Sequence, residues 1–149
     1  MNTRQIADAG TVLVQNKLLK LGLAAVRSPE RRPELLVGTF DSDRRSIVKV
    51  TTNARPKPGG GKGRPALDWW VQENMMAHAV ALADLSTGTA WLMTPSEIRE
   101  AAQQHSGGRS HLYMYIEPDA PTLTGLPNRT MDFDRFRLER RATHLLATT

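Results

Sequence analysis

Residues 33–52 read PELLVGTFDSDRRSIVKVTT, and this stretch decides the expected fold. Two largely apolar runs, residues 34–40 and 46–52, flank the polar link DSDRR. Runs of this length that are rich in β-branched residues and separated by a turn-forming cluster predict two strands joined as a hairpin. Glu34 then begins the first strand and Lys49 lies in the second, where an ion pair between them is the plain structural interpretation.

A helix is expected before the hairpin, over residues 3–21. Its apolar positions recur every three or four residues, which is typical of a helix with one buried face. Gly10 lies within this stripe and would let the helix approach a sheet closely, while Gly22 is a typical helix stop. The short apolar segment 23–26 is expected to begin the sheet.

The segments after the hairpin alternate between strand and helix patterns. A loop is expected over residues 53–65, because four glycines and three prolines cannot continue a strand. Further strands are expected at residues 67–71, 78–85, 89–93 and 110–117. A capping box at Thr94-Pro95-Ser96-Glu97 predicts a helix to about residue 104, and a last helix is expected over 132–146 after an irregular connection at 118–131.

This order predicts an α/β fold with a mixed central sheet flanked by helices. With 149 residues, the chain suits one domain over 1–149, with a core at about 5–117 and the C-terminal helix at about 132–146. Its hydrophobic fraction of 40% is sufficient for a packed interior. No apolar run is long enough to span a bilayer and no signal peptide is evident, so we expect a cytoplasmic protein without a membrane partner.

The net charge of +5 is concentrated in one quarter of the chain. Residues 27–64 contain ten basic and four acidic side chains, a balance of +6. Such clustering predicts contact with a polyanion, and a solvated basic surface is the alternative. The residues expected to bind DNA are Arg27, Arg31, Arg32, Arg44, Arg45, Arg55, Lys57, Lys62 and Arg64.

Several chemistries are excluded by spacing or composition. Lys62 follows Gly61, but Pro56 replaces the first glycine of a phosphate loop and Gly63 replaces its hydroxyl residue, so no nucleotide cofactor is expected. The chain has no cysteine, and its four histidines lack the spacing of two ligands on one helix face. No nucleophile-elbow motif is present.

Cleavage of a phosphodiester with a metal ion needs carboxylates on adjacent strands, with a lysine close by. The segments GLAAVRSP at 22–29, PELLV at 33–37 and SIVKVTT at 46–52 resemble the corresponding stretches of archaeal Holliday-junction resolvases, members of the PD-(D/E)XK nuclease superfamily. The resemblance covers roughly residues 5–105. It implies a restriction-endonuclease-like fold, Glu34 as a metal ligand and catalytic residue, Lys49 as a catalytic residue, and a homodimer.

Two departures from the family pattern affect activity. Ile47 stands where the second carboxylate belongs and has no oxygen to offer, and Thr11 stands where many members have a helix glutamate. Asp68 or Glu73 on a later strand is a candidate replacement. We therefore expect a DNA-binding protein with weak or absent phosphodiesterase activity, which needs Mg²⁺ only if it is active.

Two alternatives stay open from the sequence. One is an active Mg²⁺-dependent DNA endonuclease, and the other is a non-catalytic, dimerising accessory protein. Trp69, Trp70, Tyr113 and Tyr115 could stack on bases or form the core. Because neighbouring residues of a strand face opposite sides, at least one of the two tryptophans is expected inside the protein.

Overall fold

The computed structural model describes residues 1–31, 33–59, 63–121 and 125–147. Its helices are α1 (Thr3–Lys20), α2 (Pro95–Ala101), the 3-10 helix η1 (Thr130–Phe136) and α3 (Leu138–Leu146). Its strands are β1 (Ala24–Arg27), β2 (Glu34–Gly38), β3 (Ser46–Asn53), β4 (Lys57–Gly59), β5 (Arg64–Gln72), β6 (Ala79–Asp84), β7 (Thr89–Met93), β8 (Gln104–Ser106) and β9 (Arg109–Tyr115). The first predicted helix and the predicted hairpin strands are confirmed to within two residues.

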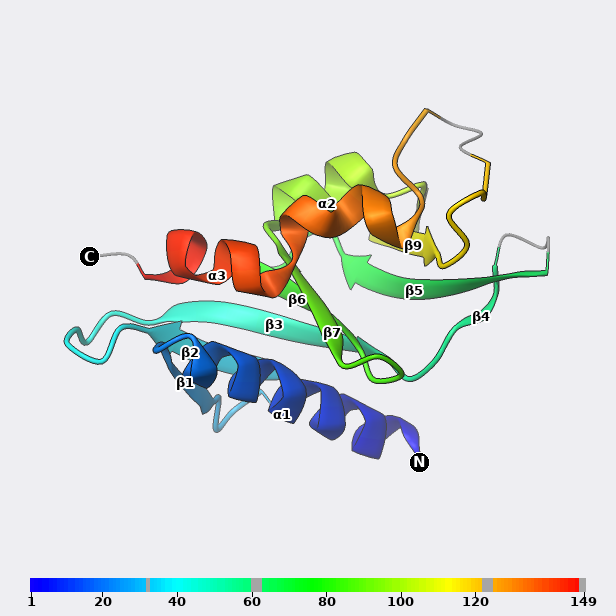
Figure 1. Cartoon of the computed structure of the whole chain (residues 1–149). Coiled ribbons are helices and arrows are strands. Elements are labelled where there is room, and N and C mark those ends of the chain that lie inside the picture. The colour runs from blue at the N-terminus through cyan, green and yellow to red at the C-terminus, as the bar shows by residue number, and fades with distance from the viewer. Residues whose placement is uncertain (32, 60–62, 122–124, 148–149) are drawn as a thin grey trace.

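The larger of the two sheets, sheet A, has the strand order β1-β2-β3-β6-β7. β3 and β6 are parallel, and the other neighbours are antiparallel. The chain leaves sheet A after β3, builds β4 and β5 elsewhere, and returns as β6 beside β3 (Figure 1). The predicted mixed sheet flanked by helices is therefore confirmed.

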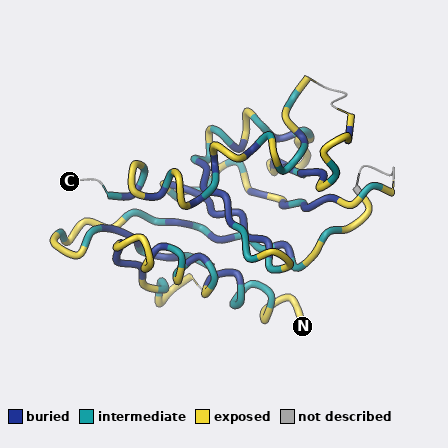
Figure 2. The backbone as a smooth tube through the Cα atoms, in the orientation of Figure 1, coloured by how far each residue is buried: buried dark blue, intermediate teal, exposed yellow. Residues whose placement is uncertain are grey.

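One face of sheet A is covered by α1 and α3. Val14 and Leu18 of α1 and Leu138 of α3 are fully buried in a cluster with side chains of β2, β3, β6 and β7. Figure 2 shows this buried layer between the helices and the sheet. Gly10 faces Thr52 of β3 so closely that a Cβ atom at this position would collide with the threonine side chain. The expected close approach at Gly10 is confirmed.

The second sheet, sheet B, was not predicted. Its antiparallel strand order is β4-β5-β9-β8. Leu67, Trp69 and Val71 of β5 pack with α2, η1, β6 and β7 in a second apolar cluster. Trp69 is 2% exposed and Trp70 is 39% exposed. The expectation that one of the two tryptophans is internal is confirmed, because the alternation of β5 sends them to opposite faces.

The predicted loop at residues 53–65 is wrong in part. Asn53 still belongs to β3, β4 occupies Lys57–Gly59, and β5 begins at Arg64. Prolines 58 and 65 face each other in the β4–β5 register, at positions where a short strand tolerates them. The strands expected at 67–71 and 78–85 are also not neighbours, since β5 pairs with β9 and β6 pairs with β3.

The prediction of one continuous helix over residues 132–146 is wrong, because the structure has two helices there, η1 and α3. They meet at Arg137, whose extended backbone bridges to Trp91. The break has a packing reason: Phe133 and Phe136 enter the cluster around sheet B, whereas Leu138 and the rest of α3 cover sheet A.

The capping box that begins α2 is confirmed, since Thr94 and Glu97 exchange hydrogen bonds of 2.8 and 3.1 Å. The helix ends at Ala101, short of residue 104, because Gln104–Ser106 pair with β9 as β8. In the described part of the chain, no helix combines the length and the apolar character that crossing a membrane requires.

Candidate nucleic-acid interface

Glu34 and Lys49 are direct register partners in β2 and β3. Opposite residues of paired strands stand on the same face, so the structure brings these two predicted site residues together. The face is the one turned away from α1, because Val48 and Val50 on either side of Lys49 belong to the α1 cluster. The Glu34 carboxylate lies 3.8 Å from the guanidinium of Arg31.

The donors around Glu34 do not fit a protein-held Mg²⁺ ion, which prefers several oxygen ligands. The side chain of Ile47, two residues before Lys49, has no oxygen atom. Within residues 1–31, 33–59, 63–121 and 125–147, no group of three histidine, aspartate or glutamate side chains could hold a metal. Thr11 is fully buried and donates to the Ala7 carbonyl, 2.8 Å away, within its own helix.

The two replacement acids considered from the sequence are engaged elsewhere. The Asp68 carboxylate lies 2.8 Å from His111 Nε2, and the Glu73 carboxylate lies 3.4 Å from His105 Nδ1. Both acids and both histidines belong to the sheet B side of the molecule. Each of the two acids thus has a histidine partner.

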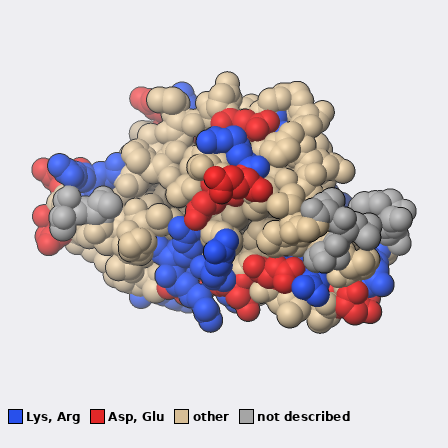
Figure 3. Space-filling model, turned by 90° about the horizontal axis from the view of Figure 1, so that it is seen from above, with Lys and Arg blue, Asp and Glu red and all other residues tan. Residues whose placement is uncertain are grey.

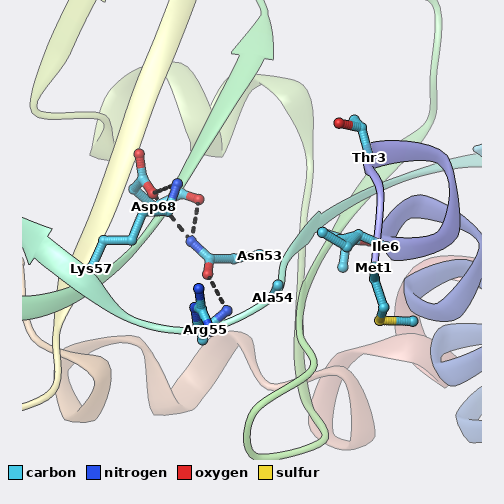
Figure 4. Close-up of a pocket in the computed structure, with 9 residues that line it drawn as sticks. Met1, Thr3, Ile6, Asn53, Ala54, Arg55, Lys57 and Asp68 are labelled. Atoms are coloured by element: carbon cyan, nitrogen blue, oxygen red, sulfur yellow. Dashed lines mark hydrogen bonds and ion pairs between the residues drawn. The ribbon is translucent and has the colours of Figure 1, made fainter.

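A cleft separates the first turns of α1 from sheet B, and we term it the α1–β5 cleft. It consists of two adjoining hollows that share Thr3, Ile6 and Thr52 in their walls. The larger has a volume of about 590 Å³ and the smaller about 390 Å³. In Figure 4, Met1, Thr3 and Ile6 stand on one side of the larger hollow, opposite the polar group around Asp68.

The charge in the α1–β5 cleft is predominantly positive. Arg55 and Lys57 line the larger hollow, and Lys49 and Arg109 line the smaller one. Asp68 is the single acid among the described residues of its walls. Four cations against one anion in a concave surface favour a polyanionic ligand, because low-dielectric walls focus the field.

Hydrogen bonds and stacking order the wall that sheet B contributes. Asn53 Nδ2 donates to the Asp68 carbonyl at 2.9 Å and to its carboxylate at 3.1 Å, and Lys57 Nζ lies 3.7 Å from the same carboxylate. The ring of His111 stacks on Trp70 with centroids 4.2 Å apart, and the guanidinium of Arg109 lies 4.8 Å from the Trp70 ring centroid. Arg109 is thereby held at the cleft by a cation–π contact.

The structure separates the predicted DNA-binding residues into groups. Arg55 and Lys57 line the cleft. Arg27 pairs with Asp8 at 2.8 Å, and Arg64 pairs with Glu117 and Asp119 at 3.7 and 3.2 Å. The others outside the cleft lie near the β1–β2 and β2–β3 connections or beyond the described residues. They are Arg31, 71% exposed beside Glu34; Arg44 and Arg45, in the β2–β3 link; and Arg32 and Lys62, outside the described residues.

Arg109 of the cleft wall, and His111, which stacks on Trp70 of that wall, had no weight in the sequence prediction of DNA binding. Arg109 lies 45 residues after Arg64, the last residue of the predicted basic stretch, and His111 was considered only as a metal ligand. The alternation of residues 109, 111 and 113 along β9 was the available signal, since it places them on one face. Tyr113 lies on that face and is half-buried, whereas Tyr115 is buried.

The C-terminal arginines have partners within the protein, some local and one on another helix. Arg141 donates to the Glu97 carboxylate at 2.6 Å, and Arg137 lies 3.9 Å from Asp134. Arg135 covers the ring of Phe136. On the face seen from above, basic and acidic side chains lie next to each other over much of the surface, and one group of basic side chains gathers in the lower middle of the view (Figure 3). Arg135 and Arg140 are exposed, whereas Arg141 is largely covered by its contacts with α2 and β7.

Comparisons with known proteins identify the fold. No protein-family model matches the chain, and no curated protein matches it. Among solved structures, a bacterial homing endonuclease superposes with a TM-score of 0.57 over 97% of this chain and 93% of that chain. The fold is nuclease-like. The two sequences are 14% identical, so the likeness concerns the architecture.

Proposed function

We propose that this protein binds DNA through the α1–β5 cleft and has weak or absent phosphodiesterase activity. The observation that carries the proposal is the charge of the cleft walls, where Lys49, Arg55, Lys57 and Arg109 stand around the single acid Asp68. Lysine and arginine neutralise backbone phosphates without reading the base sequence. The nuclease-like fold supports this ligand class, since the solved relative is described as a homing endonuclease.

We further propose a common ancestry with the PD-(D/E)XK nucleases. The resemblance of the two hairpin strands and the Glu34–Lys49 register support this ancestry. Ile47 supports the loss of cleavage, because one carboxylate beside an arginine forms an ion pair more readily than it holds Mg²⁺. Residual cleavage, if present, would depend on Mg²⁺ and on Glu34.

The test measures DNA affinity as a function of salt concentration. The logarithm of the binding constant should fall linearly with the logarithm of salt concentration, with a slope of about −0.9 per phosphate neutralised. Arg109→Ala and Lys57→Ala should each weaken binding to every sequence and make the slope shallower by about one unit. Fluorescence anisotropy with labelled duplex and branched DNA measures both quantities.

Arg140→Ala is the matched control, because Arg140 is exposed on α3 and does not line the cleft. It removes the same charge and should leave the salt slope unchanged. Equal losses in Arg140→Ala and Arg109→Ala would contradict the cleft as the binding site. No binding at low salt would contradict DNA binding itself and favour a protein partner.

Cleavage is assayed on the same DNA with Mg²⁺, Mn²⁺ or EDTA on denaturing gels. We expect shifted but uncut DNA. Metal-dependent cuts that disappear in Glu34→Ala would show that a working site survives despite Ile47, and would overturn the second half of the proposal.

A further inference from the structure

The face of sheet B that lines the α1–β5 cleft carries a row of side chains with rings. Leu67, Trp69 and Val71 of β5 pack into the second apolar cluster, so the residues between them point to the opposite face. Trp70 lies on that opposite face, directly across from His111 of β9, and further rings follow along β9 at every second position. We term this set the aromatic row; its members are Trp70, His111, Tyr113 and Tyr115.

The rings of the aromatic row contact one another in order. Their centroids lie 4.2 Å apart for Trp70 and His111, 5.9 Å for His111 and Tyr113, and 5.4 Å for Tyr113 and Tyr115. Aromatic pairs at such distances stabilise each other's positions. The Asp68 carboxylate, 2.8 Å from His111 Nε2, fixes a further point of the row. The row is therefore a preformed surface of ring atoms.

Trp70 is the most exposed member of the aromatic row. It is 39% exposed and lines the smaller hollow of the cleft together with Arg109. The Arg109 guanidinium lies 4.8 Å from the indole centroid, and no hydrogen bond or ion pair with the described residues holds it there. An exposed indole with an adjacent mobile cation offers a flat surface to a base and a charge to the phosphate beside that base.

A small pocket continues the aromatic row on the same face. His111 and Tyr113 line it, and its walls come from β4, β5, β8 and β9. Lys57 and Asp68 belong both to this pocket and to the larger hollow of the cleft, so the two spaces adjoin. The volume of the pocket is about 130 Å³. A cavity of about 150 Å³ accommodates benzene, so the pocket has room for little more than one ring.

Unpaired bases are the ligand that uses both the cations and the rings. In a duplex the bases stack on one another inside the helix, and their faces are out of reach of a protein surface. A single strand exposes its base faces as well as its phosphates. Proteins that bind single strands combine a positively charged groove with aromatic side chains on which bases stack. The cleft and the aromatic row provide these two parts side by side.

We propose that unpaired bases of single-stranded DNA stack on the aromatic row, chiefly on Trp70, while the cations of the cleft contact the phosphates. This inference rests on the proposed function, since it names the form of DNA that the same cleft binds. Asp68 lies beside the row, but Asn53 and His111 occupy its carboxylate and Lys57 offsets its charge. The protein should therefore prefer single strands and gaps over a continuous duplex of equal length.

The test compares DNA strands that differ only in their bases. An oligothymidylate and an abasic strand of the same length carry the same phosphates, so the ratio of their affinities reports contacts with bases. Wild-type protein should bind the oligothymidylate at least tenfold more tightly. Trp70→Ala should lower this ratio roughly tenfold and leave the affinity for the abasic strand nearly unchanged, because the cations of the cleft remain. Fluorescence anisotropy at one salt concentration measures both affinities.

Phe40→Ala is the matched control, because Phe40 is an exposed ring outside the cleft, the pocket and the aromatic row. It should leave the affinity ratio of the two strands unchanged. Trp70→Phe keeps a ring at the same position and should retain more of the ratio than Trp70→Ala does. This order of the variants follows from stacking and not from the removal of a charge, since none of them changes the net charge.

Tryptophan fluorescence provides a measurement on the wild-type protein. The chain has three tryptophans, and Trp69 and Trp91 are buried, at 2% and 3% exposed. A base that stacks on Trp70 should quench the emission of that ring. The oligothymidylate should therefore quench the protein in a saturable way, the abasic strand should quench it far less, and Trp70→Ala should abolish the difference.

Three results would overturn the inference. They are equal affinities of the wild type for the two strands, an affinity ratio that Trp70→Ala leaves unchanged, and an equal loss of that ratio in Phe40→Ala. Each can occur while Arg109→Ala and Lys57→Ala still weaken the salt-dependent binding of duplex DNA, so failure here is distinguishable from failure of the proposed function. An absence of binding to every strand and duplex at low salt would overturn both.

Discussion

Glu34 in sheet A and Asp68 in sheet B show how differently the two sheets use a carboxylate. Glu34 pairs across the register with Lys49 and has a 3.8 Å ion pair with the exposed Arg31. Asp68 is contacted by His111, Asn53 and Lys57, and its histidine stacks on Trp70. The acid that the family resemblance predicted as a site residue, Glu34, thus has few polar contacts. Asp68, in the sheet that was not predicted, is the centre of a connected polar network.

The comparison shows which chemical groups each region offers to a ligand. Ile47 removes the oxygen that a metal site requires beside Glu34, and the cations gather instead in the cleft formed with sheet B. Binding of an anion needs only cations in a concave surface, while cleavage needs carboxylates at fixed positions. The described residues place four cations around the cleft, whereas no group of three histidine, aspartate or glutamate side chains among them could hold a metal.

The largest expected effect is on the free energy of unfolding, and it differs between the two faces of sheet B. Trp69→Ala should lower the free energy of unfolding by about 3–5 kcal/mol, because it leaves a large cavity in the cluster shared with sheet A. Trp70→Ala, at the adjacent but exposed position, should cost far less. Urea denaturation of both variants makes the comparison, and equal losses would contradict the opposite burial of the two rings.

In sheet A, the contact between Gly10 and Thr52 is the sharpest packing constraint. Gly10→Ala should destabilise the protein by about 1–3 kcal/mol, because the added Cβ collides with the threonine side chain. Thr52→Ala should restore only part of the loss in the double variant, because it removes the hydroxyl and the methyl group but leaves the Cβ of residue 52, which lies 2.7 Å from the added Cβ. A double-mutant cycle by thermal or urea denaturation measures the coupling, and strictly additive effects would mean that the two side chains do not touch.

The two carboxylates can be compared directly. Asp68→Ala should cost about 1–2 kcal/mol, because it leaves His111 without its acceptor and Asn53 with the backbone carbonyl of residue 68 alone. Glu34→Ala removes a long ion pair with an exposed arginine from a side chain that is itself 13% exposed, and should cost about 1 kcal/mol or less. Chemical denaturation at neutral pH ranks the two. A larger loss in Glu34→Ala would reverse the comparison between the sheets.

The smallest effect concerns the ion pair of Arg141 with Glu97, which links α3 over sheet A to α2 over sheet B. Burial raises the pKa of Glu97, but the hydrogen bonds from Arg141 and Thr94 and the arginine charge lower it more, so the pKa lies below its ordinary value of 4.5. A lowered pKa stabilises the fold above pH 4.5, and that contribution disappears as the pH falls through the folded-state pKa.

Glu97→Gln should therefore lose about 0.2–1 kcal/mol at neutral pH and nothing relative to wild type in acid. Glutamine keeps the capping box of α2, so the variant isolates the charge. Glu100→Gln, exposed on the same helix, is the control and should show no such pH-dependent difference. A constant difference between wild type and Glu97→Gln across this pH range would contradict the assignment.

The sequence by itself determined the elements whose patterns are local. The helix α1, the hairpin of β2 and β3 and the capping box of α2 depend on residues close to one another in the sequence. Gly10 was recognised from its place in the helix pattern, although its partner Thr52 is distant in the sequence. Alternation within each strand also predicted that Trp69 and Trp70 would face opposite sides. The α/β fold with a mixed sheet flanked by helices followed from these elements and their order, whereas the nuclease-like fold was expected from the resemblance of the hairpin strands to a known family.

Only the tertiary structure decided which strands pair and which cations meet. β5 pairs with β9, some 45 residues away, and this pairing creates the face on which Asp68 meets His111 and Trp70 holds Arg109. The same packing pairs Arg64 and Arg27 with acids distant in the sequence. Charge density along the chain cannot show these outcomes, because long-range strand pairing and helix docking set the neighbours of each side chain.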